Sequence, residues 1–199
     1  MSRLGFIAAG VLLACCACGG SETAHGGSGV VTPHGIGPLR IDVSTRSAVV
    51  AFAGKPEVAT TGRTRWGPPW RVSNFRALAY GCTRDFGVGS GLGLDVGPDW
   101  SCRTVYYINA RTHRLSAFST DSPAFETTKG ISPGMAQNDA DRLARTTPHG
   151  YWHAIGERAP GGNLVLPILC RRKVSGRCSG KVEVFMLESR HHPIGLTFT

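Results

Sequence analysis

Two stretches of the chain, residues 35–56 and residues 130–148, carry the same order of features: a glycine, a short apolar run, a polar stop and a compact helical pattern. A shift of 92 residues aligns them, so that Val43 falls on Met135. A chain that repeats a helix-forming unit is expected to give both copies similar local folds. The sequence is therefore interpreted as an internal duplication.

The first copy predicts a short helix with defined ends. Ser44 or Thr45 can cap its start by accepting a hydrogen bond from an otherwise unpaired N–H. Gly54 suits the left-handed position that follows a helix, and Pro56 prevents the helix from continuing. Apolar residues at spacings of three and four give the helix one hydrophobic face, formed by Ala48, Val49, Phe52 and Ala53.

The second copy predicts a helix over about residues 137–146, with Asn138 as its candidate cap and Leu143 and Ala144 on its apolar side. Runs of β-forming residues follow each helix. These expected strands are residues 74–82, 102–109, 115–120, 164–170, 181–188 and 194–198. Prolines or closely spaced glycines predict loops over residues 61–72, 83–101 and 149–163.

The predicted fold is α+β: two tandem repeats of a short helix plus a three-stranded antiparallel sheet, over residues 35–122 and residues 123–199. The helices are expected on one face of the antiparallel sheet, which leaves the other face for a ligand. About 165 residues follow the predicted N-terminal segments, enough for one moderate domain or for two small units that share a core.

Residues 1–14 are typical of a lipoprotein signal peptide. Arg3 is followed by an eleven-residue apolar run, which is too short to span a bilayer because a spanning helix needs about 20 residues. The run ends in Leu-Leu-Ala before Cys15, which resembles a bacterial lipobox and predicts lipidation of Cys15. Cys16 and Cys18 are alternative acceptors, and an ordinary secretory signal is the alternative to the lipobox. The mature protein is expected to be a membrane-anchored, extracytoplasmic lipoprotein of the cell envelope.

Residues 15–34 are expected to form a flexible tether between the anchor and the folded part. They are rich in glycine, serine and threonine and almost free of large apolar residues. Such a segment cannot bury enough surface to offset the entropy of ordering it. His25 and His34, which lie in this tether, are expected to be solvated.

The chain is basic, with 22 Lys and Arg against 13 Asp and Glu and a formal net charge of +9. In a cytosolic protein this excess would suggest nucleic acid. The export signal makes an anionic envelope surface the better partner, so no nucleic acid is expected. No dense basic block occurs, and the arginines in the middle of the chain are scattered as on an ordinary solvated face: Arg63, Arg65, Arg71, Arg76, Arg103, Arg111 and Arg114.

Four cysteines lie in the part that is expected to fold, and an exported protein is expected to form disulfides from them. In each half, one cysteine closes a predicted strand and another opens the next. Adjacent antiparallel strands would bring such residues together, which predicts the pairs Cys82–Cys102 and Cys170–Cys178. No two of the four lie close enough in sequence to form a CxxC redox or zinc motif.

The Leu-Arg-Ile run at residues 39–41 and the capped helix that ends in Gly-Lys-Pro at residues 54–56 resemble BamE/SmpA-like lipoprotein modules. They are also similar to the tandem module of β-lactamase inhibitory proteins. The resemblance covers residues 35–120 and, more loosely, residues 130–199. It implies a binding module without catalytic residues. The duplication and the paired cysteines depart from a single BamE-like module.

The residues that could carry catalysis do not form a recognisable motif. His149 and His153 have a zinc-ligand spacing for a helix, but the proline and glycine beside His149 favour a loop. His191 and His192 fall in an expected turn. The glycine-rich residues 83–101 lack the GxGxxG and GK[ST] patterns of phosphate loops, and no G-x-S-x-G occurs. We therefore expect no enzyme activity, no cofactor and no metal site.

Binding residues are expected instead among the aromatic and arginine side chains of loops, because Trp, Tyr and Arg dominate binding hot spots. The alternative is that the tryptophans fill the core. The predicted function is non-catalytic binding of an envelope or secreted protein or of another envelope ligand. Inhibition of a secreted hydrolase and BamE-like assistance in outer-membrane protein assembly are the alternatives. The candidate binding residues are Trp66, Trp70, Arg71, Trp100, Tyr151 and Trp152.

Overall fold

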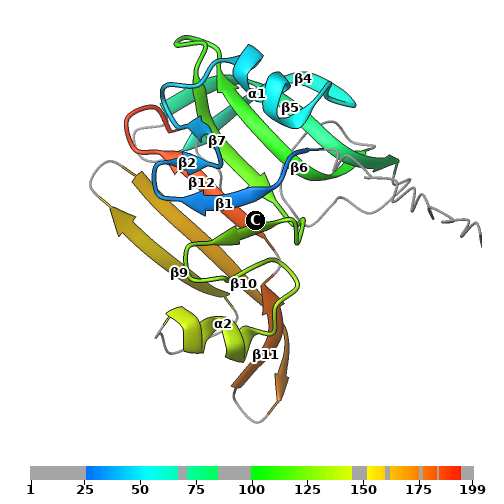
Figure 1. The fold of residues 1–199 in the computed structure, drawn as a ribbon, viewed down its shortest axis with the longest axis vertical. Coiled ribbons are helices and arrows are strands. Elements are labelled where there is room, and N and C mark those ends of the chain that lie inside the picture. The colour runs from blue at the N-terminus through cyan, green and yellow to red at the C-terminus, as the bar shows by residue number, and fades with distance from the viewer. Residues whose placement is uncertain are drawn as a thin grey trace, which may run out of the picture.

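The computed structural model describes residues 26–66, 71–84, 100–144, 152–159, 162–174, 177–182 and 184–193, some of them by their backbone alone. Strands dominate this part of the chain. Its two helices, α1 (Arg46–Ala53) and α2 (Gln137–Ala144), have eight residues each and lie near opposite ends of the molecule (Figure 1).

Eight of the described strands form one antiparallel sheet. At its centre β7 (Leu115–Thr120) pairs with β12 (Phe185–Ser189). On one side β7 is followed in order by β6 (Trp100–Asn109), β5 (Arg71–Arg84) and β4 (Val58–Trp66). On the other side β12 pairs with β10 (Gly162–Val174), which also pairs with β9 (Trp152–Ala159) and β11 (Arg177–Val182).

A smaller sheet has the strand order β3 (Leu39–Arg40), β2 (Gly35–Ile36), β1 (Gly29–Thr32) and β8 (Phe125–Thr127). β1 pairs with β8 in parallel, and the other two pairings are antiparallel. All four strands of this sheet contribute a buried apolar side chain to the largest cluster of core residues: Val31, Ile36, Leu39 and Phe125.

The predicted fold class is wrong. The strands of the two halves do not form two tandem helix-plus-three-strand units but one continuous sheet, because β12 pairs with β7 over Phe185–Thr120 to Glu188–Ala117. In separate sheets both strands would have been edges with unpaired N–H and C=O groups. The second sheet and the shortness of both helices make the protein mostly β rather than an α+β tandem.

The segment expected as a tether belongs in part to the fold. Residues 26–34 contain β1, in which Val31 is fully buried and pairs with Ile36 on one side and Thr127 on the other. The Tyr106 hydroxyl also donates a hydrogen bond to the Gly26 carbonyl (2.7 Å). The signal peptide, the rest of the tether and Cys15, Cys16 and Cys18 lie outside the described residues.

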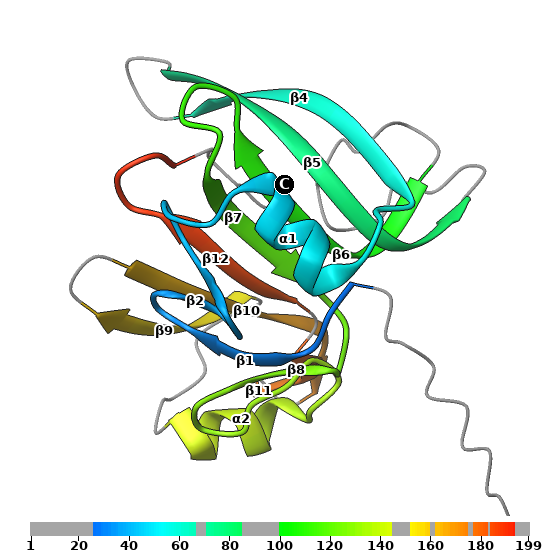
Figure 2. The same ribbon diagram turned by 45° about the horizontal axis from the view of Figure 1, so that its top comes forward.

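α1 begins and ends where the sequence predicts. Of the two candidate caps it is Thr45 whose Oγ1 accepts a hydrogen bond from the Ala48 N–H (3.3 Å). Gly54 has a φ of 85°, and its N–H donates to the Val50 carbonyl (2.9 Å). The helix lies over β5 and β6 (Figure 2), where its buried residues pack in one cluster with Leu78, Tyr80, Tyr106 and Phe118.

α2 differs from its prediction in its cap and in its buried face. It begins at Gln137, so Asn138 lies inside the helix and is not its cap. Leu143 is 40% exposed, whereas Ala140 and Asp141 are buried. The segment before the helix pairs with β11, where the Val182 N–H donates to the Met135 carbonyl (2.8 Å). In this position Ala140 lies in the main core and Ala144 packs against it, as predicted for Ala144, whereas Leu143 is turned outward.

Several loop and strand boundaries also change. Residues 61–72, expected as a loop, mostly belong to the β4–β5 hairpin, and residues 149–163 include β9. The strand expected over residues 181–188 is divided between β11 and β12. Four expected strands are confirmed within β5, β6, β7 and β10, whereas residues 194–198 lie outside the described part.

The middle of the large sheet is covered on both faces. All six residues of β7 are buried, and most of the buried apolar residues in the described part of the chain fall into two clusters. The first cluster combines residues of α1 and of the small sheet with residues of the large sheet. The second lies on β5, β6 and β7 and includes Phe75 and Tyr107, whose rings meet edge to face at 5.3 Å.

Candidate functional site

The three aromatic candidates whose backbone is described lie at separate places in the large sheet. Trp66 pairs with Arg71, the first residue of β5, whereas Trp100 pairs with Arg84, the last residue of the same strand. A strand of 14 residues is roughly 40 Å long. Trp152 begins β9 in the other half of the large sheet. The remaining two candidates, Trp70 and Tyr151, lie outside the described residues.

The first predicted disulfide is confirmed. Cys82 and Cys102 are register partners on β5 and β6, are bonded to each other, and have Cα atoms 4.0 Å apart. The second pair differs in its backbone setting, because Cys178 of β11 lies opposite Lys173 of β10, next to a register shift. The Cys170–Cys178 disulfide therefore stays a prediction.

The histidines singled out in the sequence lie apart. His149 is outside the described residues, and His153 lies in β9, where only its backbone is described. His191 and His192 follow β12, and their N–H groups donate to the Ser189 hydroxyl (3.1 and 2.8 Å). In the described part of the chain no three His, Cys, Asp or Glu side chains come together as metal ligands.

Arginines that are far apart in the sequence meet around Asn74. Arg63 of β4 pairs with Asn74, and Arg76 lies two residues further along β5 on the same face. The Asn74 carbonyl accepts a hydrogen bond from the Ala110 N–H (3.0 Å), which places the β6–β7 turn beside it. Arg111 is the next residue of that turn. Three elements therefore bring exposed arginines to one end of the sheet.

Arg114 ends the turn and links it to α1. Its carbonyl accepts a hydrogen bond from the Asn109 N–H, and its guanidinium donates to the Val43 carbonyl, both at 2.9 Å. Its backbone also bridges to Thr45, the cap of α1, so that Arg46 at the start of the helix lies nearby. We call the exposed side chains of Arg46, Arg63, Arg76, Arg111 and Arg114 the arginine surface.

The arginine surface has an excess of positive charge. Among the described residues none of its five guanidinium groups has an ion-pair partner. Asp42 lies next to it, since its N–H donates to the Leu115 carbonyl (2.8 Å), but its carboxylate accepts a hydrogen bond from the Ser189 hydroxyl (2.6 Å). An excess of exposed positive charge on one part of the molecule favours the binding of an anion there.

Elsewhere in the described structure, Arg142 of α2 forms an ion pair with Asp139 (2.8 Å). Arg103 forms an ion pair with Asp121 (3.2 Å) near the end of β7. Burial raises the pKa of Asp121, and the hydrogen bond and charge of Arg103 oppose that rise. In the core, burial raises the pKa of Tyr80 to about 12, while the charge of Arg46 acts in the opposite direction.

The arginine surface was not apparent in the sequence. In the sequence the arginines are scattered without a dense block, the predicted loop over residues 61–72 includes Arg63 of β4, and nothing distinguishes Arg46. The signal lay in β4, where Thr61, Arg63 and Arg65 alternate with smaller residues as on one face of a strand. The pairing of β4 with β5 then decides which arginines become neighbours.

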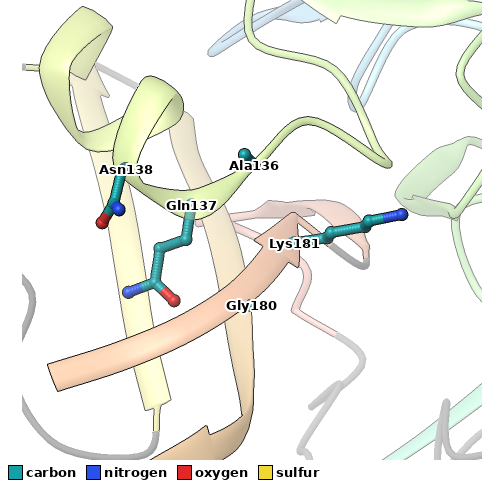
Figure 3. A pocket seen from close by; sticks show the side chains of 5 residues that line it. All are labelled: Ala136, Gln137, Asn138, Gly180 and Lys181. Atoms are coloured by element: carbon teal, nitrogen blue, oxygen red, sulfur yellow. The ribbon is translucent and has the colours of Figure 1, made fainter. Parts of the chain in front are cut away.

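A pocket of about 340 Å³ lies between the start of α2 and β11 (Figure 3). The side chains of Gln137 and Asn138 point from the first turn of the helix toward the strands, near Gly180, whereas the Lys181 side chain points away from them. The lining, completed by Ala136, offers amide and backbone hydrogen-bonding groups and the Lys181 ammonium and, among the described residues, no carboxylate. It is suited to non-covalent contact with a small polar group.

No helix in the described part of the chain has the length and apolar character needed to cross a bilayer. No protein-family model matches the chain, and no curated protein matches it. Among solved structures, the chain is similar to the uncharacterized protein yfeY from Escherichia coli. The sequence identity is 14% and the TM-score 0.40, over 81% of this chain and 99% of that chain.

Proposed function

We propose that this protein is a membrane-anchored, extracytoplasmic lipoprotein that works as a non-catalytic binding module of the cell envelope. The arginine surface is the proposed contact with an anionic partner, and Cys15 is the proposed site of the lipid anchor. The observation that carries the proposal is the gathering of five exposed guanidinium groups from α1, β4, β5 and the β6–β7 turn, none of them ion-paired among the described residues.

The chemistry of arginine favours this role. A guanidinium group is planar, stays charged, and can donate two parallel N–H bonds to a carboxylate or a phosphate. A surface of such groups without matching acids is typical of a site for anions. The sequence resemblance to BamE/SmpA-like modules is compatible with it, because that resemblance implies binding and not catalysis.

The backbone that carries these arginines is held in place by strand pairing and by hydrogen bonds in the turn. β4 and β5 pair over nine residue positions beneath Arg63 and Arg76. The β6–β7 turn is held by the Asn109 side chain, which accepts hydrogen bonds from the N–H groups of Arg111 (2.8 Å) and Thr112 (3.0 Å). A surface whose backbone is already ordered loses less conformational entropy on binding, which favours affinity.

The test is capture of partners from detergent-solubilised envelopes by the full acylated protein. The Arg63→Glu/Arg76→Glu variant reverses two charges of the arginine surface. The matched control, Lys55→Glu/Arg142→Glu, changes the net charge equally at exposed positions elsewhere. We expect the wild type and the control to retain the same partner, and the arginine variant to retain at least about tenfold less of it, because two direct contacts become repulsive.

Equal capture by all three proteins would contradict the role of the arginine surface. The identity of an arginine-dependent partner separates the alternatives. A β-barrel assembly complex indicates the BamE-like role, and a secreted hydrolase that loses activity in the complex indicates inhibition.

A further inference from the structure

We propose that the arginine surface binds the phosphate groups of anionic phospholipids, in the same membrane that holds the proposed lipid anchor. The folded part would then lie against the bilayer in one orientation instead of moving freely at the end of its tether. This inference rests on the proposed function, because it names the partner of the same surface.

The donor set suits phosphate. The positively charged side chains of the surface are all arginines, which can pair with two phosphate oxygens at once. Thr61, which pairs with Arg76, and Asn74, which pairs with Arg63, place uncharged polar groups among them on the same sheet face. Diagonal neighbours on such a face are roughly 7–8 Å apart, so that adjacent arginines can share one phosphate or bind two.

The layout of the surface suits a membrane better than a small free anion. The five arginines come from a helix, two strands and a turn, and all five side chains are exposed. The described pocket lies elsewhere, between α2 and β11, and does not enclose them. Only several separated negative charges can pair with all five arginines at once. The surface of an anionic bilayer provides such charges.

The chain enters the fold about one helix length from Arg46. The Gly26 N–H donates to the carbonyl of Ala53 (3.3 Å), the last residue of α1, whereas Arg46 is the first. A helix of eight residues is about 12 Å long. Cys15 precedes Gly26 by eleven residues, a reach of at most roughly 40 Å. An anchor at Cys15 and the arginine surface can therefore reach one bilayer together.

The test places the acylated full-length protein in vesicles of phosphatidylcholine alone or of phosphatidylcholine with phosphatidylglycerol, and follows amide hydrogen exchange. We expect exchange over residues 58–66 and 109–114 to slow at least about threefold in the anionic vesicles. High salt and the Arg63→Glu/Arg76→Glu variant should remove this protection, because salt screens the charges and the variant reverses them. Residues 136–144 of the α2 region are the internal control, and Lys55→Glu/Arg142→Glu is the matched variant.

Equal exchange in both kinds of vesicle, or protection that survives the arginine variant, would overturn the phospholipid assignment. If the arginine variant nevertheless loses a protein partner in the capture experiment, the proposed function stands and the partner of the surface is a protein. If neither capture nor exchange depends on the arginines, both proposals fail.

Discussion

Gly62 lies opposite Phe75 on the β4–β5 hairpin, and a Cβ atom at position 62 would meet the ring of Phe75. The ring is buried and packs against Tyr107, so it has little room to move aside. We expect Gly62→Ala to destabilise the protein by about 1–3 kcal/mol, although alanine usually stabilises a strand relative to glycine. Urea denaturation of the two proteins measures the difference.

The Phe75→Leu background supplies the control, because it removes the ring that the new methyl group would meet. There Gly62→Ala should cost clearly less than in the wild type. An equal cost in both backgrounds would show that contact with the ring is not the cause.

Three tyrosines of the sheet should respond to alkaline pH. Burial raises the pKa of Tyr80 to about 12 and raises the pKa values of Tyr106 and Tyr107 as well. Since the folded state favours the neutral phenol, the unfolded chain loses its protons first, from about pH 10. The stability that these groups contribute is therefore complete below pH 10 and is lost as the pH rises toward the folded-state values.

Spectrophotometric titration of phenolate checks this expectation. In the folded protein most of the phenolate signal should appear well above pH 10, whereas in urea all of it should appear near pH 10. A native titration that coincides with the denatured one would mean that these phenols are open to solvent. Tyr107→Phe should remove one late-titrating group and leave the others unchanged.

At the scale of elements, the Cys82–Cys102 disulfide fastens β5 to β6 across a sequence separation of 20 residues. A crosslink of this length stabilises the folded state by about 3 kcal/mol in the chain-entropy model. The Cys82→Ala/Cys102→Ala variant should lose that amount in chemical denaturation. Reduction of the wild type should cost at least as much, because it would also open the predicted Cys170–Cys178 bond. A double-alanine variant as stable as the wild type would contradict the expectation.

Elements with strong local signals were predicted well, and those fixed by pairing were not. α1 is marked by its cap, its apolar spacing and its terminal Gly54, all of which act within one short segment. The β4 strand holds Gly62 and few large apolar residues, and only its pairing with β5 makes it a strand. The exposure of Leu143 likewise depends on how α2 packs against β11, which no local pattern of the helix records.

The candidate site could be predicted only in its chemistry. Composition indicated an anionic partner, and the sequence supplied arginines, but their meeting point depends on two pairings that are remote in sequence. These are the register of Arg63 with Asn74 and the hydrogen bond from Ala110 to Asn74. The fold separates two of the aromatic candidates instead of bringing them together, because Trp66 and Trp100 pair with opposite ends of β5.

At the scale of the whole molecule, the two halves should unfold as one. The main core combines Val31 and Tyr106 with Phe125, Phe185 and Leu187, so residues from both expected repeats share it. We therefore expect circular dichroism and tryptophan fluorescence to report one coincident unfolding transition, and residues 26–122 expressed alone to lack a cooperative transition. A stable fragment with its own sharp transition would contradict this expectation.

The parallel pairing of β1 with β8 gives the fold a mechanical property. Tension on the segment before Gly26 reaches the fold at a carbonyl held by the Tyr106 hydroxyl, and then pulls along β1. The β1–β8 pairs, from Gly29–Phe125 to Val31–Thr127, are thereby loaded in shear, so that their hydrogen bonds resist together instead of opening one after another. With the proposed anchor at Cys15, a pull from a bound partner would load these pairs along the direction of the strands.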